Sequence, residues 1–70
     1  MTKEAFWTEL DALRRQLELS YRKLARRIGT SPTNVCRWLG KHSAPSPLAR
    51  RAIIDRIRAV AAGELPAKRP

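Results

Sequence analysis

Apolar residues recur along most of this chain at spacings of three and four positions, which is the period of an amphipathic α-helix. The first such segment covers residues 3–18, and Thr2 stands where a side-chain oxygen can cap its first N–H groups. Its apolar stripe consists of Phe6, Leu10, Leu13 and Leu17. Leu19 follows directly and is expected to dock into the core. Trp7 lies beside the stripe, and the pattern leaves open whether it flanks the core or contributes to a contact between subunits.

Residues 20–40 have the pattern of two short helices separated by one break. Ser20 and Ser31 each stand immediately before an apolar face, where a side-chain oxygen caps a starting helix. Gly29 suits the left-handed conformation that ends the first helix, and Pro32 suits the first position of the second, where its missing N–H has no partner to lose. The apolar positions of the pair are Leu24, Ala25, Ile28, Val35, Trp38 and Leu39. Because about three residues join the two helices, they must cross steeply and bury these faces together.

A fourth helix is predicted over residues 47–62, since Ser46 precedes a proline and Gly63 follows the last apolar position. Its apolar band consists of Leu48, Ala49, Ala52, Ile53, Ile57, Val60 and Ala61, with Ile54 beside it. This band is wider than a core alone requires, so part of it is expected to form a dimer surface. The residues expected there are Ile54, Ile57 and Ala61. Residues 64–70 have two prolines and two basic residues, which predicts a disordered tail.

The length and composition indicate one small all-α domain. A domain of 70 residues buries only about 60% of the surface of its unfolded chain, so the core is expected to be small. Hydrophobic residues make up 43% of the chain, which argues against disorder in its body. We therefore expect a compact four-helix domain over residues 1–63, followed by the tail.

The same composition limits the cellular compartment and the kinds of chemistry that can be expected. No apolar run approaches 18 residues, and the first ten residues lack the uninterrupted apolar region of a secretory signal. Cys36 is the one cysteine and His42 the one histidine, so neither a disulfide within the chain nor a zinc site of Cys and His is expected. The chain has no phosphate-binding glycine loop and no nucleophile with a plausible base, so no enzyme activity, metal or cofactor is expected. These features predict a cytoplasmic protein.

The net charge of +9 is the most informative bulk property because it is unevenly spread. Residues 1–20 have a net charge of −1, with three basic and four acidic side chains. Residues 21–58 have ten basic side chains and only one acidic one. A positive field centred on the paired helices and the helix after them predicts a polyanionic partner, with nucleic acid first. Basic residues that merely solvate exposed faces, and a cationic helix on a lipid surface, are the alternatives.

The stretch LSYRKLARRIGTSPTNVCRWLGKHSAPSP resembles the helix-turn-helix of the phage-repressor (Cro/Xre-like) DNA-binding family. The order apolar, small, apolar, glycine, apolar, apolar carries the resemblance. The matching residues are Leu24, Ala25, Ile28, Gly29, Val35 and Trp38. The resemblance implies a lambda-repressor-like fold with a central helix-turn-helix. It covers the middle of the chain closely and the flanking helices only in pattern, and family members often have five helices where four are predicted here.

In such a unit the second helix enters the major groove of DNA and the first crosses the backbone. The residues expected to contact bases are Thr33, Asn34 and Arg37. Arg37 can donate two hydrogen bonds to guanine, whereas Asn34 could pair with adenine or serve the local backbone. Cys36, next to Arg37, is interpreted as a semi-buried packing residue, with a redox role as the alternative, and Trp38 as a core residue.

Further side chains are expected to contact the DNA backbone through charge, hydroxyl groups or the N–H groups of a helix N-terminus. These are Ser20, Tyr21, Arg22, Ser31, Lys41, His42 and Ser43. For His42, a solvated loop residue is the alternative to a phosphate contact.

These observations lead to one principal hypothesis and two rivals. The principal hypothesis is a sequence-specific transcriptional regulator of double-stranded DNA, of phage, plasmid or bacterial type and nucleoid-associated, that represses by binding a palindromic operator as a homodimer. The main rival is an antitoxin-like or other interaction protein whose chief partner is another protein. RNA binding is a weaker third.

Overall fold

Each helix of this protein begins at a side chain that caps it. The computed structural model describes residues 1–63, in which every N-cap hydroxyl accepts a hydrogen bond from the backbone N–H three residues further on. The distances range from 3.0 Å at the first helix to 3.4 Å at the last. The capping residues are Thr2, Ser20, Ser31 and Ser46. All four starts therefore agree with the caps that the sequence predicts.

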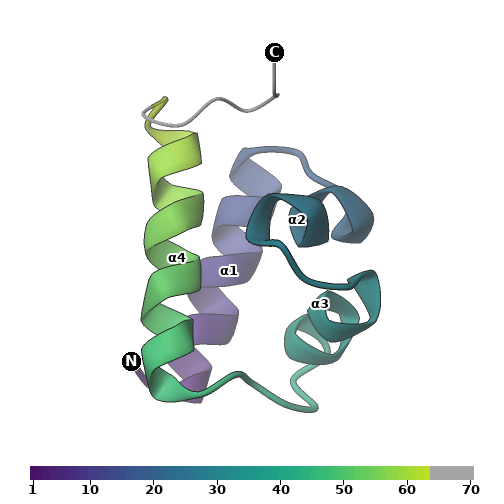
Figure 1. Cartoon of the computed structure of the whole chain (residues 1–70), viewed down its shortest axis with the longest axis vertical. Coiled ribbons are helices and arrows are strands. Elements are labelled where there is room, and N and C mark those ends of the chain that lie inside the picture. Colours follow the sequence, from purple (N-terminus) through teal and green to yellow (C-terminus); the bar gives the residue numbers. More distant parts are fainter. Residues whose placement is uncertain (64–70) are drawn as a thin grey trace.

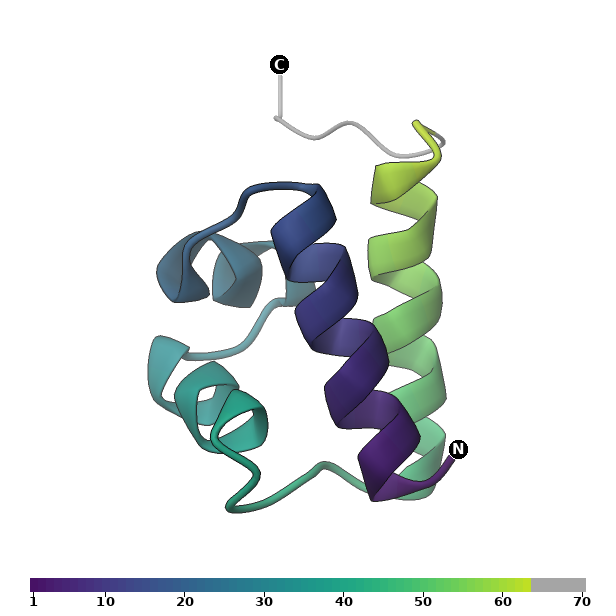
Figure 2. The same cartoon turned by 180° about the vertical axis from the view of Figure 1, so that it is seen from behind.

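The chain folds into α1 (Lys3–Gln16), α2 (Tyr21–Ile28), α3 (Pro32–Leu39) and α4 (Pro47–Ala61), and residues 1–63 contain no strand. Figures 1 and 2 show α1 and α4 side by side, with the short helices α2 and α3 together on one side of that pair. The all-α, four-helix fold is confirmed. Residues 64–70, where the tail is predicted, lie outside the described residues.

Left-handed residues end α1 and α3 as well as α2. After α2 the left-handed residue is Gly29, as predicted, with φ 87°. After α1 it is Glu18, with φ 54°, and the N–H of Leu19 donates to the carbonyl oxygen of Arg14 over 3.0 Å. This arrangement is a Schellman motif, which satisfies the last carbonyls of a helix. It also ends α1 at Gln16, two residues before the approximate end that the sequence predicts.

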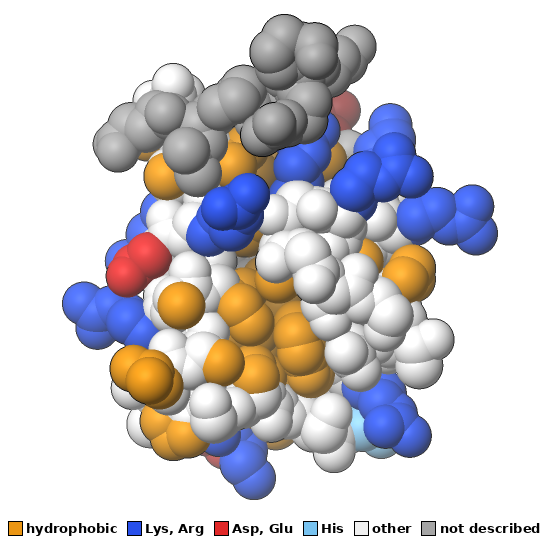
Figure 3. All heavy atoms as spheres, in the orientation of Figure 1, with side chains coloured by type: hydrophobic (Ala, Val, Ile, Leu, Met, Phe, Trp, Pro, Cys, Tyr) orange, Lys and Arg blue, Asp and Glu red, His pale blue; other side chains and the backbone are white. Residues whose placement is uncertain are grey.

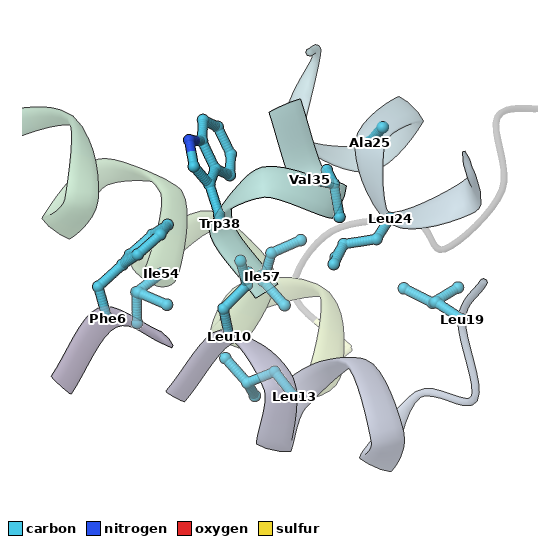
Figure 4. Close-up of a cluster of buried hydrophobic side chains, with 10 residues drawn as sticks. All are labelled: Phe6, Leu10, Leu13, Leu19, Leu24, Ala25, Val35, Trp38, Ile54 and Ile57. Carbon is cyan, nitrogen blue, oxygen red and sulfur yellow. The ribbon is translucent and has the colours of Figure 1, made fainter. Parts of the chain in front are cut away.

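The core lies where all four helices meet (Figure 4). Phe6 and Trp38 pack edge to face with ring centroids 5.7 Å apart, which joins α1 to α3. The core cluster comprises Phe6, Leu10, Leu13, Leu19, Leu24, Ala25, Val35, Trp38, Ile54 and Ile57. The core positions predicted for Leu19 and Trp38 are confirmed, and Leu17 is only half-buried at the edge.

The rotation of α4 differs from the prediction. Ile54 and Ile57 are completely buried, whereas Leu48 is 85% exposed. Ile54 and Ile57 therefore belong to the core of their own chain, and their expected place in a dimer surface was wrong. Ala61, the third residue expected there, is half-buried against the same core. Apolar residues surround much of this helix, so its pattern alone did not specify which side faces inward.

Candidate nucleic-acid interface

The α2–α3 segment carries basic residues without acidic ones. Residues 20–43 contain six Lys and Arg side chains and no Asp or Glu. Three acidic side chains of residues 1–63 form ion pairs on α1 and α4: Glu9 with Arg58, Asp11 with Arg14 and Arg15, and Asp55 with Arg51. Because these pairs neutralise charge away from α2 and α3, the positive field concentrates on the two short helices. Figure 3 shows basic side chains projecting from the edge that α2 forms and near the lower end of α3.

The turn between α2 and α3 brings the two helices into close contact. The N–H groups of Gly29 and Thr30 both donate to the carbonyl oxygen of Ala25, over 2.8 and 2.9 Å. Ala25 is 1% exposed, and its small side chain lets α3 approach α2. Val35 and Trp38 are the buried residues of α3, and their side chains point toward the core. The opposite face of α3 is thereby left on the surface.

That outer face of α3 carries two of the three predicted base contacts. Thr33 and Arg37 are both exposed and lie four residues apart, on the side of the helix away from Val35. Cys36 is exposed on the same face, so its interpretation as a semi-buried packing residue was wrong. Its spacing of three from Thr33 was the signal that could have placed it there.

Asn34, the third predicted base contact, stands at the edge of this face and is tied to the turn. Its Nδ2 donates to Thr30 Oγ1 over 2.9 Å, while its backbone N–H donates to Ser31 Oγ over 3.2 Å. Ser31 therefore caps α3 as predicted, and its side chain stays exposed. The pairing with Thr30 gives Asn34 a local partner of a kind that the sequence did not identify.

The loop after α3 is held in place by hydrogen bonds to its backbone. Lys41 is left-handed, with φ 64°, and the N–H of His42 donates to the carbonyl oxygen of Arg37 over 2.9 Å. Trp7 Nε1 on α1 donates to the carbonyl oxygen of Ser43 over 3.0 Å. Lys41, His42 and Ser43 are all exposed, so their side chains stand on an anchored loop.

Arg50 holds the other end of the same loop. Its Nε donates to the carbonyl oxygen of Pro45 over 2.7 Å, and its Nη1 reaches the carbonyl oxygen of Met1 over 3.1 Å. The sequence predicted neither this anchor nor the one from Trp7. The bonds from Trp7 to Ser43 and from Arg50 to Met1 join residues that are distant along the chain, and the bond from Arg50 to Pro45 depends on the fold of the loop.

The start of α2 forms the remaining part of the predicted interface. Ser20, Tyr21 and Arg22 are exposed there, and the guanidinium of Arg14 lies over the Tyr21 ring, 5.2 Å from its centroid. Tyr21 and the C-terminal end of α3 line one open cleft of about 600 Å³. Its lining residues are Trp7, Thr8, Asp11, Ala12, Arg14, Arg15, Tyr21, Leu39 and Lys41. Two predicted backbone contacts, from opposite ends of the α2–α3 segment, thus share one cleft.

Within residues 1–63, no three or more His, Cys, Asp or Glu side chains gather into a metal-binding group. In the same part of the chain, no helix is both long enough and apolar enough to cross a membrane.

Comparison of the chain with protein-family models, with curated proteins and with solved structures gives no match in any of the three.

Proposed function

We propose that this protein is a sequence-specific double-stranded-DNA-binding regulator of transcription, in which α2 and α3 act as a helix-turn-helix. The observation that carries the proposal is the exposed outer face of α3, with Thr33 and Arg37, within a segment that holds six basic and no acidic side chains. Such a charge distribution attracts a polyanion, and an exposed helix fits the major groove. The proposed mode of regulation is repression by occluding a promoter.

In this proposal α3 enters the major groove and supplies the base contacts. Arg37 donates two hydrogen bonds to O6 and N7 of a guanine, the commonest specific contact in such complexes. Thr33 offers a hydroxyl to a base edge or a phosphate and a methyl group to thymine. Val35 and Trp38 are buried and take no part in base contacts.

Phosphate contacts on either side of the groove then fix the position of α3. Ser20, Tyr21 and Arg22 stand at the N-terminus of α2, where backbone N–H groups and the helix dipole favour an anion. Lys41, His42 and Ser43 meet the backbone from the loop after α3. Because Trp7 and Arg50 anchor that loop, little further ordering is needed when it binds.

Selection of bound duplexes from a random pool tests the proposal. The expected result is an enriched palindrome whose half-sites are about 34 Å apart, one turn of DNA, as a two-fold dimer requires. Failure to enrich any sequence, together with equal binding to every duplex, would refute sequence-specific regulation. The dimer contact in this proposal lies outside Ile54 and Ile57, which the core occupies.

An interaction protein, such as an antitoxin, is the second candidate function, and one observation favours it. Leu48 on α4 is 85% exposed, on the surface away from the core. Burial of a leucine side chain contributes about 1.5–3 kcal/mol, so this position would favour a protein contact. Sedimentation of wild type and Leu48→Glu with a co-encoded protein, in the presence and absence of duplex DNA, separates the candidates. A Leu48-dependent complex with another protein that excludes DNA would support the interaction protein.

A further inference from the structure

Thr30 and Asn34 form a side-chain pair at the start of α3, the end of the helix that lies nearest the turn from α2 (Figure 1). The Nδ2 of Asn34 donates to Thr30 Oγ1 over 2.9 Å. Both residues are also held through their backbones. The N–H of Thr30 donates to the carbonyl oxygen of Ala25, and the N–H of Asn34 donates to Ser31 Oγ. The pair therefore joins two backbone positions that the turn and the helix cap already hold.

This hydrogen bond determines how the Asn34 amide is presented. A carboxamide has two N–H donors and one carbonyl oxygen. One N–H is engaged by Thr30, which turns the nitrogen toward the α2–α3 turn and leaves Oδ1 and the second N–H for another partner. Without the threonine hydroxyl the amide can rotate, because its terminal torsion is broad and roughly two-fold. Nitrogen and oxygen could then exchange places.

We infer that Thr30 is a positioning residue that makes Asn34 select adenine, an inference that rests on the proposed function. Adenine presents its N6 donor beside its N7 acceptor in the major groove, which matches the Oδ1 and N–H of a held amide. Guanine presents two acceptors, and thymine one acceptor beside a methyl group. A rotating amide can turn its N–H toward either of those bases, whereas the held amide keeps its oxygen facing a donor.

The experiment is duplex selection with three forms of the whole chain. Thr30→Val keeps the shape of the side chain and removes the hydroxyl, and Thr30→Ser keeps the hydroxyl as the matched control. Wild type and Thr30→Ser are expected to select adenine at one position of each half-site. Thr30→Val is expected to weaken that preference about three- to tenfold, which corresponds to one hydrogen bond, and to leave the other positions unchanged.

The outcomes separate the inference from the function on which it rests. If wild type enriches no sequence, the proposed function fails. If wild type enriches a site but Thr30→Val keeps the full adenine preference, or no adenine position depends on Asn34, the inference is wrong and the proposed function stands.

A double-mutant cycle distinguishes positioning from a purely structural role. In an Asn34→Ala background, Thr30→Val is expected to change duplex affinity no further, since the group that it positions is gone. A loss that persists in that background would overturn the inference. In the DNA-free protein, the Asn34 amide proton that is donated to Thr30 Oγ1 is expected to be shifted downfield in wild type and Thr30→Ser. In Thr30→Val that proton is expected to move toward the shift of a solvated amide, and an unchanged shift there would count against the hydrogen bond itself.

Discussion

Glu18 occupies a backbone conformation that favours glycine, and its replacement is expected to stabilise the protein. With φ 54°, it is the left-handed residue of the motif that ends α1. A side chain in this conformation costs about 1–2 kcal/mol. Its carboxylate also lies at the C-terminus of a helix, where the dipole disfavours negative charge by about 0.3–1 kcal/mol. Glycine would remove both costs.

The net effect of Glu18→Gly follows from three contributions. Relief of the left-handed conformation and loss of the carboxylate both raise the free energy of unfolding, while the greater freedom of glycine in the unfolded chain lowers it by about 0.5–1 kcal/mol. The balance is a gain of about 1 kcal/mol, or about 4–8 °C in Tm for a domain of this size. Glu18→Gln removes only the charge and is expected to raise the free energy of unfolding by about 0.3–1 kcal/mol, less than Glu18→Gly does.

Urea unfolding, followed by tryptophan fluorescence, measures these differences, and two further positions serve as controls. Lys41 is also left-handed, with φ 64°, at the end of α3, but its charge suits the helix dipole. Lys41→Gly should therefore change the free energy of unfolding by no more than about 0.5 kcal/mol. Gly29→Ala should lower it by about 1 kcal/mol through backbone conformation alone, since a Cβ there meets nothing within 4 Å. Equal gains from Glu18→Gly and Glu18→Gln would refute the conformational reasoning.

Three further predictions concern binding and packing. The affinity of the wild type for duplex DNA should fall steeply as the salt concentration rises, and a flat salt response would contradict nucleic-acid binding. Lys41→Gln should reduce the slope of log affinity against log salt concentration by about 1. Arg37→Ala should weaken binding to the selected site by about 1–3 kcal/mol and relax the sequence preference at one base pair, with Arg51→Ala on α4 as the control. An equal loss of affinity for random duplex would make Arg37 a phosphate contact. Ile54→Ala should lower the free energy of unfolding by about 2–5 kcal/mol and Leu48→Ala by less than about 0.5 kcal/mol, and the reverse order in urea unfolding would refute the observed rotation of α4.

Local features of the sequence determined where the helices begin and how the central pair is divided. The hydroxyls of Ser20 and Ser31 cap the helices that follow them, and Gly29 adopts the left-handed conformation that the pattern requires. Each of these effects acts within a few residues of its origin, so it can be predicted without the tertiary structure. The exposure of Arg37 belongs to the same class, because it follows from the helical period once Val35 and Trp38 turn inward.

The tertiary structure decided what depends on contacts between segments. It placed Ile54 and Ile57 in the core and left Leu48 exposed, because α4 packs against α1 and α2 and these two helices select one side of a helix that is apolar on several. It also placed Trp7 against the backbone of Ser43, 36 residues away.

At the proposed interface, the sequence supplied the side chains and the charge, while the fold decided their presentation. Cys36 is exposed on the same face as Thr33, as its spacing of three residues already indicated. The partner of the Asn34 amide, Thr30, is only four residues away, but the conformation of the turn decides that the two side chains meet. A pattern of polar and apolar residues predicts which face of a helix is exposed. How an amide on that face is oriented depends on the partner that the turn provides, and no periodicity in the sequence encodes it.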